Sequence, residues 1–137
     1  NAKCETLQKK PSFRNIVKMK KCLIIADGFY EWKSTAMGKI CYYISSKKDD
    51  LFTFAGIWSD WLDESNGEII KSVSLITQTA NKVMSEIHNT KRRQPVILNQ
   101  HNQENWLNSR LDYQNILNES FNIDLDFKTV KSPLTFR

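Results

Sequence analysis

The sequence predicts a single α+β domain, residues 1–137, built round a curved antiparallel β-sheet with short flanking helices. Stretches rich in β-branched and aromatic residues, which are typical of strands, dominate the first half of the chain. The spacing of apolar residues becomes helical near residue 80 and again after residue 100. The chain has no internal repeat or linker, and its 137 residues suit one hydrophobic core.

The first half of the chain predicts one helix and four strands. Pro11 and Ser12 precede apolar residues at helical spacing, which predicts a short amphipathic helix at about 11–20. The stretch "CLIIADGFYEWK" predicts two strands separated by a break at Asp27-Gly28. The stretches "KICYYISS" and "LFTFAGIWSDW" predict two more strands, and the four strands together indicate an antiparallel meander.

The second half predicts a hairpin followed by shorter elements. Asn66-Gly67 lies between apolar runs and is the strongest hairpin signal, so "EIIKSVSLIT" is expected to be the returning strand. The stretch "TANKVMSEIH" predicts a helix that Thr79 or Asn81 caps and that ends near His88. An extended segment at "PVIL", two short helices at "NQENWLNS" and "DYQNILNESF", and a final strand at "DLDFKTVKS" complete the expected order.

Composition limits the classes of function. The net charge of +5 and the pI of about 9.1 favour an anionic partner, nucleic acid above all. The 3 cysteines are odd in number and lack C-x-x-C spacing, so we expect no disulfide framework, no metal site and a reducing cytoplasmic location. No apolar run approaches the roughly 20 residues that span a bilayer, so no membrane association is expected.

Glu31 is the first candidate for chemistry. It stands among Phe29, Tyr30 and Trp32, where a carboxylate is costly to desolvate and can serve as a general acid or base. A structural interpretation competes with this one. On a strand, Tyr30 and Trp32 share one face while Phe29 and Glu31 share the other, so Glu31 could simply point to solvent.

His88 is the second candidate. It ends the predicted helix and precedes Lys91, Arg92 and Arg93 in a turn closed by Pro95. A histidine there can exchange protons with a substrate, and the adjoining cations can hold phosphate. The alternative is a helix-ending residue beside a solvated basic turn.

Other residues have weaker claims to a functional role. Cys4 follows a lysine, which would lower the thiol pKa, although a small buried residue is the commoner role for a single cysteine. Trp58 and Trp61 could stack on bases, but we expect at least one of them in the core. Trp106 is expected to anchor a helix on the core, and His101 to be a surface residue.

Four ordered segments resemble one family. The stretches "NAKCET…KPSFR", "CLIIADGFYEWK", "FAGIWSDW" and "TQTANKVMSEIHNTKRRQPVIL", covering roughly residues 1–98, resemble the SRAP family, the SOS response-associated peptidase-like proteins. Each motif alone is weak, and their shared order makes the match specific. The resemblance implies a barrel-like antiparallel sheet with short flanking helices.

The resemblance also implies a function in the DNA damage response. Such proteins react with abasic sites in single-stranded DNA and shield them as a covalent DNA–protein crosslink. The nucleophile is a cysteine left at the N-terminus after removal of Met, and its amine and thiol form a thiazolidine with the sugar aldehyde. The same cysteine is linked to autoprocessing, a peptidase reaction. A cytoplasmic, nucleoid-associated monomer without a cofactor is expected.

The site residues implied by the resemblance follow from matching positions. Asn1 matches the first residue of the family's "NAR" motif and would orient the cysteine or the sugar. Glu31 matches the "GFYEW" glutamate, a proton-transfer group, and His88 matches the histidine that assists sugar ring opening. Trp32 would lie beside the DNA path. On this basis we favour a functional role for Glu31 and His88.

The sequence departs from the family pattern at the expected DNA contacts. Lys3 replaces the "NAR" arginine, so it keeps the charge but loses the two-pronged contact to phosphate. The turn "HNTKRRQP" is longer than the family's H-x-R-M-P and has Gln94 at the Met position. Arg93 is the first choice for the phosphate-binding arginine, and Arg92 is the alternative.

The family's N-terminal segment, with its Cys-Gly-Arg start, is not matched within these 137 residues. Cys4 does not match the catalytic cysteine and carries no free α-amine, so it is not expected to form a thiazolidine. We therefore expect the proton-transfer residues here and the nucleophile upstream in a longer parent, with the 137-residue chain inactive alone.

Two other functions remain open. A non-covalent single-stranded DNA-binding module would use the basic turn and the tryptophans, with salt-dependent affinity and little preference for abasic strands. An unrelated hydrolase would use Glu31 and His88.

Overall fold

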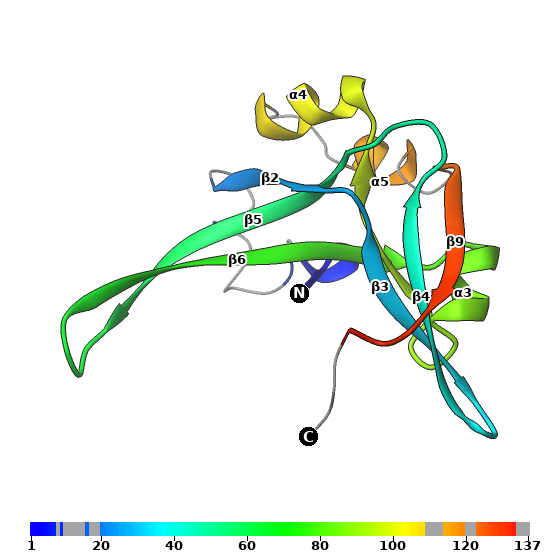
Figure 1. Cartoon of the computed structure of the whole chain (residues 1–137). Helices are drawn as coiled ribbons and strands as arrows, with labels where there is room; N and C mark the ends of the chain where they lie inside the picture. Colours follow the sequence, from blue (N-terminus) through cyan, green and yellow to red (C-terminus); the bar gives the residue numbers. More distant parts are fainter. Residues whose placement is uncertain (8, 10–15, 17–19, 109–113, 120–122, 134–137) are drawn as a thin grey trace.

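The computed structural model describes residues 1–7, 9, 16, 20–108, 114–119 and 123–133. The fold is α+β, mostly β-sheet with a few short helices, and in the described part of the chain the sheets curl without closing (Figure 1). The strands are β1 (Ala2–Lys3), β2 (Lys21–Ala26), β3 (Phe29–Thr35), β4 (Gly38–Ser46), β5 (Phe52–Asp63), β6 (Glu68–Thr79), β7 (Arg93–Pro95), β8 (Ile97–Leu98) and β9 (Leu125–Val130). The helices are the 3-10 helix η1 (Cys4–Thr6) and the α-helices α3 (Lys82–Ile87), α4 (Gln100–Asn108) and α5 (Gln114–Glu119). The predicted fold class is confirmed.

The strands form two sheets rather than one meander. A six-stranded sheet has the order β1-β6-β5-β2, with β7 beside β6 and β8 beside β5, and a three-stranded sheet has the order β3-β4-β9. The predicted meander is wrong, because β2 pairs with β5 and not with β3. In addition, β1 runs parallel to β6. Strand pairing depends on segments far apart in sequence, so local composition did not reveal it.

The break at Asp27-Gly28 is where the chain passes from the first sheet to the second. The ring of Tyr43 on β4 lies so close to Gly28 that a Cβ atom there would clash with it. Tyr30, two residues after Gly28, packs its ring against the same Tyr43 ring, with the centroids 5.3 Å apart. Glycine at position 28 thus lets the Tyr43 ring pack against the backbone, and a larger residue there would displace that ring.

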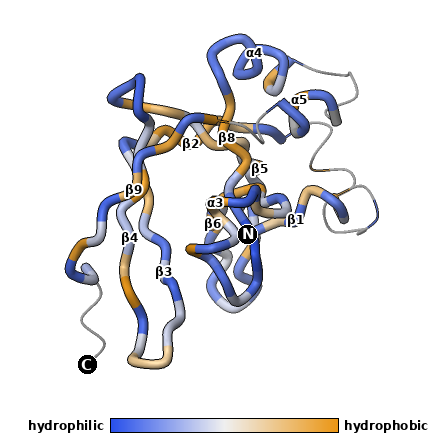
Figure 2. The backbone as a smooth tube through the Cα atoms, turned by 90° about the vertical axis from the view of Figure 1, so that its right-hand side faces the viewer, coloured by the Kyte–Doolittle hydropathy of each residue, from blue (hydrophilic) through white to orange (hydrophobic). Residues whose placement is uncertain are grey.

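The core consists of two apolar clusters on opposite sides of β5. Phe52 and Phe54 belong to one cluster, whereas Ala55 and Ile57 belong to the other. Helix α4 packs over β2, β5 and β8, the apolar stretches that lie beneath it in Figure 2. Its Trp106 is fully buried and donates its Nε1–H to the Cys22 carbonyl at 3.1 Å, which confirms the predicted helix anchor.

The β5–β6 hairpin forms an arm that extends away from the rest of the molecule (Figure 1). Its turn follows Asp63, whose carbonyl accepts a 2.7 Å hydrogen bond from Gly67 N–H, and Gly67 has φ of 76°. The predicted hairpin is thus confirmed. Trp58 and Trp61 lie on the arm and are 37% and 56% exposed. The expectation that at least one of them is in the core is wrong, because the arm extends past the body that would cover it.

Helix α3 begins and ends where the sequence predicts. Of the two proposed caps, Asn81 is the one used, since its side chain accepts a 2.9 Å hydrogen bond from Met84 N–H. Met84 and Ile87 are buried. His88 is the C-terminal cap of α3, so it lies directly after the last helical residue, Ile87.

The remaining elements agree with the predicted order, with β7 and β8 at the extended segment and β9 as the final strand. The helix expected at about 11–20 lies outside the described residues apart from Ile16 and Lys20. No helix in the described ranges is long and apolar enough to cross a membrane.

Candidate functional site

A pocket of about 690 Å³ lies where β1, β3, β6 and the turn between α3 and β7 meet. Six of the seven residues predicted for catalysis or DNA binding line it, namely Asn1, Lys3, Glu31, Trp32, His88 and Arg93. The seventh, Arg92, is exposed and is not among the lining residues. Residues as far apart in sequence as Asn1 and Pro95 therefore meet at one cavity.

The alternation of β3 decides which way Glu31 points. Phe29 packs its ring edge-on against Phe52 and Phe54, so its face of the strand is turned toward the core. Glu31 shares that face, and its side chain is only 21% exposed. The interpretation in which Glu31 points to solvent is wrong, because its side chain lies in the pocket beside His88 and is mostly covered.

Glu31 and His88 form a close acid–base pair. Glu31 Oε2 lies 3.5 Å from His88 Nδ1, and Glu31 Oε1 accepts a 3.1 Å hydrogen bond from Trp32 N–H. His88 Nδ1 is also 3.0 Å from the Arg93 carbonyl oxygen. A carbonyl only accepts, so Nδ1 carries the proton in that bond and Nε2 is the nitrogen left to gain or lose one. The arrangement is suited to proton transfer within the pocket.

Asn89 anchors the turn that carries His88 to β3. Its Oδ1 accepts a 3.0 Å hydrogen bond from Ser34 N–H, and its Nδ2 donates a 2.8 Å bond to the Ser34 carbonyl. The side chain thus pairs with β3 as a neighbouring strand would. Because Glu31 lies on the same strand, these two bonds help to set the distance between Glu31 and His88.

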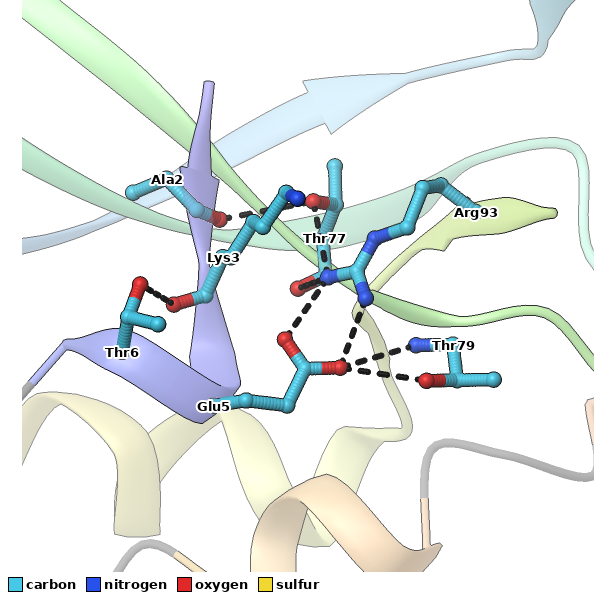
Figure 3. A network of polar contacts seen from close by, with 7 residues as sticks. All are labelled: Ala2, Lys3, Glu5, Thr6, Thr77, Thr79 and Arg93. Carbon is cyan, nitrogen blue, oxygen red and sulfur yellow. Dashed lines mark hydrogen bonds and ion pairs between the residues drawn. The ribbon is translucent and has the colours of Figure 1, made fainter. Parts of the chain in front are cut away.

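Arg93 is bound by Glu5 in a bidentate ion pair (Figure 3). Its Nη1 lies 2.6 Å from Glu5 Oε1 and its Nη2 lies 2.9 Å from Oε2. Nη2 also donates to the Thr77 carbonyl at 2.6 Å, and Glu5 accepts from the backbone and hydroxyl of Thr79. The hydrogen bonds from Arg93 lower the pKa of the Glu5 carboxyl to about 2. The positive charge of Arg93 is therefore already balanced by the Glu5 carboxylate.

Strand β1 presents Asn1 and Lys3 to the pocket. Ala2, between them, is 1% exposed and belongs to the core, so its neighbours lie on the opposite side of the strand. Lys3 is the register partner of Thr77 and is exposed. A short parallel strand is thus enough to place both predicted residues at the cavity.

None of the cysteines has the environment of an activated thiol. Burial, and then the Glu5 carboxylate, raises the pKa of the Cys4 thiol to about 11, so the lowering expected from Lys3 is wrong. Burial also raises the pKa of Cys22 and Cys41. The thiols are protonated at neutral pH, and all three cysteines are free. Within the described ranges, no group of three or more His, Cys, Asp or Glu side chains is arranged to hold a metal ion.

Sequence reasoning missed several residues at this site. Glu5 was not expected as the partner of Arg93, and Asn89 was not expected to bind β3. Lys39 also lines the pocket and was not expected there, whereas Lys91, another lining residue, belongs to the basic turn that the sequence had indicated. The adjacency of Asn89 to His88 was the one available signal, since partners far apart in sequence leave no local pattern.

Several known proteins are similar to this chain in sequence. A family model described as "SOS response associated peptidase (SRAP)" matches residues 1–134. A protein named "Abasic site processing protein YoqW" from Bacillus subtilis (strain 168) is 41% identical over 111 residues, covering 80% of this chain and 48% of that protein. "Abasic site processing protein HMCES" from Gallus gallus is 32% identical over 117 residues, covering 72% of this chain and 34% of that protein.

Solved structures share the fold. A protein from Bacteroides thetaiotaomicron superposes with a TM-score of 0.85 at 35% identity, and the match covers 96% of this chain and 58% of that one. A protein from Bordetella bronchiseptica has a TM-score of 0.78 at 22% identity, a likeness of fold alone. The chain spans about half the length of the first curated relatives that it matches, at 48% of YoqW.

Proposed function

This chain belongs to the SOS response associated peptidase (SRAP) family, and on that premise we propose that it processes abasic sites in single-stranded DNA. Relatives at 41% and 32% identity are named abasic site processing proteins. The observation that carries the proposal is the Glu31–His88 contact of 3.5 Å inside a pocket that four cationic side chains also line.

The proposed reaction is formation of a covalent thiazolidine crosslink. The amine of an N-terminal cysteine, in a longer form of the protein, adds to the aldehyde carbon of the ring-opened sugar. Loss of one water gives an imine. The thiol then adds to the imine carbon and closes the five-membered ring. Sugar opening, water loss and ring closure each require a proton to be delivered or removed.

The pocket residues supply those proton transfers in the proposal. The Arg93 carbonyl holds the Nδ1 proton of His88, which leaves Nε2 to protonate the departing hydroxyl and the sugar ring oxygen. Glu31, beside the imidazole, accepts the proton that the attacking amine releases. Asn1 orients the cysteine or the sugar, and Trp32 lies along the DNA.

The residues proposed to contact phosphate differ in whether their charge is exposed or already paired within the protein. Lys3 is exposed at the pocket and contacts the DNA backbone. Arg92 is exposed on the neighbouring turn, so it is the arginine that a phosphate can reach. Arg93, held by Glu5, supports the site rather than the DNA.

The test compares this chain with a form extended to the natural start of its gene. Each is incubated with single-stranded DNA bearing one abasic site and run on a denaturing gel. We expect a shifted covalent band from the extended form alone. A band from the 137-residue chain would mean that an internal Lys or Cys reacts, which would overturn the proposed nucleophile.

Variants of the extended form separate chemistry from binding. Glu31→Gln and His88→Ala are expected to slow crosslinking by about 10²-fold or more, the usual contribution of a general acid or base. Glu64→Gln and His101→Ala remove the same groups at exposed positions away from the pocket and should leave the rate unchanged. Equal rates in all four variants would remove Glu31 and His88 from the mechanism.

The gel also decides between covalent and non-covalent function. If no form gives a covalent band, while salt-dependent binding persists with equal affinity for intact and abasic strands, the protein is a non-covalent single-stranded DNA-binding module.

A further inference from the structure

Among the described residues, several cationic side chains of the pocket form no ion pair with a carboxylate. Four cations line it, Lys3, Lys39, Lys91 and Arg93, against one carboxylate, Glu31. Arg93 is paired with Glu5. Among the described residues, none of the three lysines forms an ion pair with a carboxylate. All three are exposed, so an anion from solution can reach them.

Lys39 is the second residue of β4 and directly follows the tight turn that joins β3 to β4. The turn depends on Gly38, whose φ of 123° is a conformation that other residues rarely adopt. Thr35 Oγ1 donates a 2.8 Å hydrogen bond to the Gly38 carbonyl. In the strand register, Lys39 is the partner of Ser34. The base of the Lys39 side chain is therefore fixed beside Ser34.

The turn that carries Lys91 is bound to the same residue, Ser34, through Asn89. Both hydrogen bonds of Asn89 go to the Ser34 backbone, and Lys91 follows two residues later. The next residue, Arg92, donates its N–H to the His88 carbonyl at 2.8 Å. The segment that carries Lys91 is thus fixed before and after it. Ser34 joins the two segments, so Lys39 and Lys91 lie on the same wall of the pocket.

We propose that Lys39 and Lys91 together form a phosphate-binding site for the DNA backbone on this wall. The inference rests on the proposed function and extends it. Lysine binds phosphate as a flexible point charge, so the pair positions the strand without reading its sequence. Lys3 lies on β1, in the other sheet. A strand that contacts Lys3 and the lysine pair crosses the pocket, with a sugar above Glu31 and His88.

The test measures binding of the 137-residue chain to a fluorescent single-stranded oligonucleotide with one abasic site, from 50 to 200 mM salt. Each phosphate contact on a single strand contributes about 0.7 to the slope of log K against log salt. The Lys39→Gln/Lys91→Gln double variant should therefore lose about 1.4 from the slope. The Lys48→Gln/Lys71→Gln variant removes the same charge at exposed positions outside the pocket and should keep the wild-type slope.

A second readout requires no variant. Acetylation of the wild-type protein with and without the oligonucleotide, read by mass spectrometry, should show protection of Lys39 and Lys91 by DNA and none of Lys48 and Lys71. This result would support the site even if a variant folded poorly.

The outcomes separate the lysine site from the proposed function. If the protein binds abasic strands but the two double variants lose the same slope, or the protection falls elsewhere, the site is wrong and the proposed function stands. If the wild-type chain does not bind the abasic strand under any of these salt conditions, the lysine site is wrong, and the crosslinking gel with the extended form decides the proposed function separately.

Discussion

Two carboxylates near the pocket contact a basic side chain, and the two contacts differ in geometry. Glu5 meets Arg93 through two hydrogen bonds of 2.6 and 2.9 Å and also binds Thr79. Glu31 meets His88 through one contact of 3.5 Å, longer than the 3.0 Å contact between the same histidine nitrogen and the Arg93 carbonyl. The first is a bidentate ion pair, and the second is a single, longer acid–base contact.

This difference in geometry indicates that the first pair is structural and that the second is available for chemistry. A bidentate guanidinium–carboxylate pair with further backbone bonds has little freedom, so it stabilises the fold. The single 3.5 Å contact between Glu31 and His88 is longer than a strong hydrogen bond, so it fixes neither side chain firmly. Arg93 serves both pairs, since its side chain binds Glu5 and its carbonyl binds the His88 ring.

Arg93→Ala should produce the largest loss of stability. It removes the partner of Glu5 and the donor to the Thr77 carbonyl, and we expect the free energy of unfolding to fall by about 2–3 kcal/mol. Urea denaturation measures this. Arg92→Ala, at the exposed neighbouring position, should change it by less than about 0.5 kcal/mol. Similar losses in both variants would mean that the Glu5 pair is not structural.

Glu5→Gln should have a smaller effect that depends on pH. The hydrogen bonds from Arg93 lower the Glu5 pKa from 4.5 to about 2, so its contribution is present above pH 4.5 and is lost as the pH falls towards 2. The Glu5 side chain is 45% exposed, and screening by water limits the contribution to about 1 kcal/mol. Urea denaturation at several pH values should show wild type and variant differing at pH 7 and converging near pH 2. A constant difference would contradict the assignment.

Asn89→Ala should cost about 0.5–1 kcal/mol, because two exposed hydrogen bonds to Ser34 are lost. The sharper measurement is amide hydrogen exchange, in which Ser34 N–H should exchange faster. Asn89→Asp keeps the acceptor and removes the donor, so Ser34 N–H should stay protected in that variant. Unchanged exchange in Asn89→Ala would show that the turn is held by other contacts.

Glu31→Gln should have the smallest effect on stability, under about 0.5 kcal/mol, because the 3.5 Å contact to His88 contributes little. Thermal unfolding measures it. A fall in Tm comparable to that of Arg93→Ala would make the second pair structural as well, and the comparison between the two pairs would fail.

Local sequence patterns predicted the elements well. Aromatic and β-branched runs located β2 to β6, and Asn81 was among the two predicted caps of α3. The same patterns failed where the answer depended on a distant segment. The meander was wrong because β2 selects β5 as its partner, and the prediction for Trp58 and Trp61 was wrong because the hairpin arm extends beyond the core.

The candidate site was predicted as a set of residues but not as a geometry. Motif order brought together Asn1, Glu31 and His88, and the structure has all three at one pocket. The state of Arg93 was not predictable, since its partner Glu5 is 88 residues away in sequence.

The positions of strands and helices, and the residue types that are candidates for chemistry, could be predicted from local patterns, because alternation, helical spacing and capping act over a few neighbouring residues. Long-range packing was needed to show that Glu31 faces His88, that Glu5 neutralises Arg93 and that Asn89, 55 residues from Ser34, anchors the turn. Those outcomes depend on which distant segments pack together, and electrostatic partners are set by that packing.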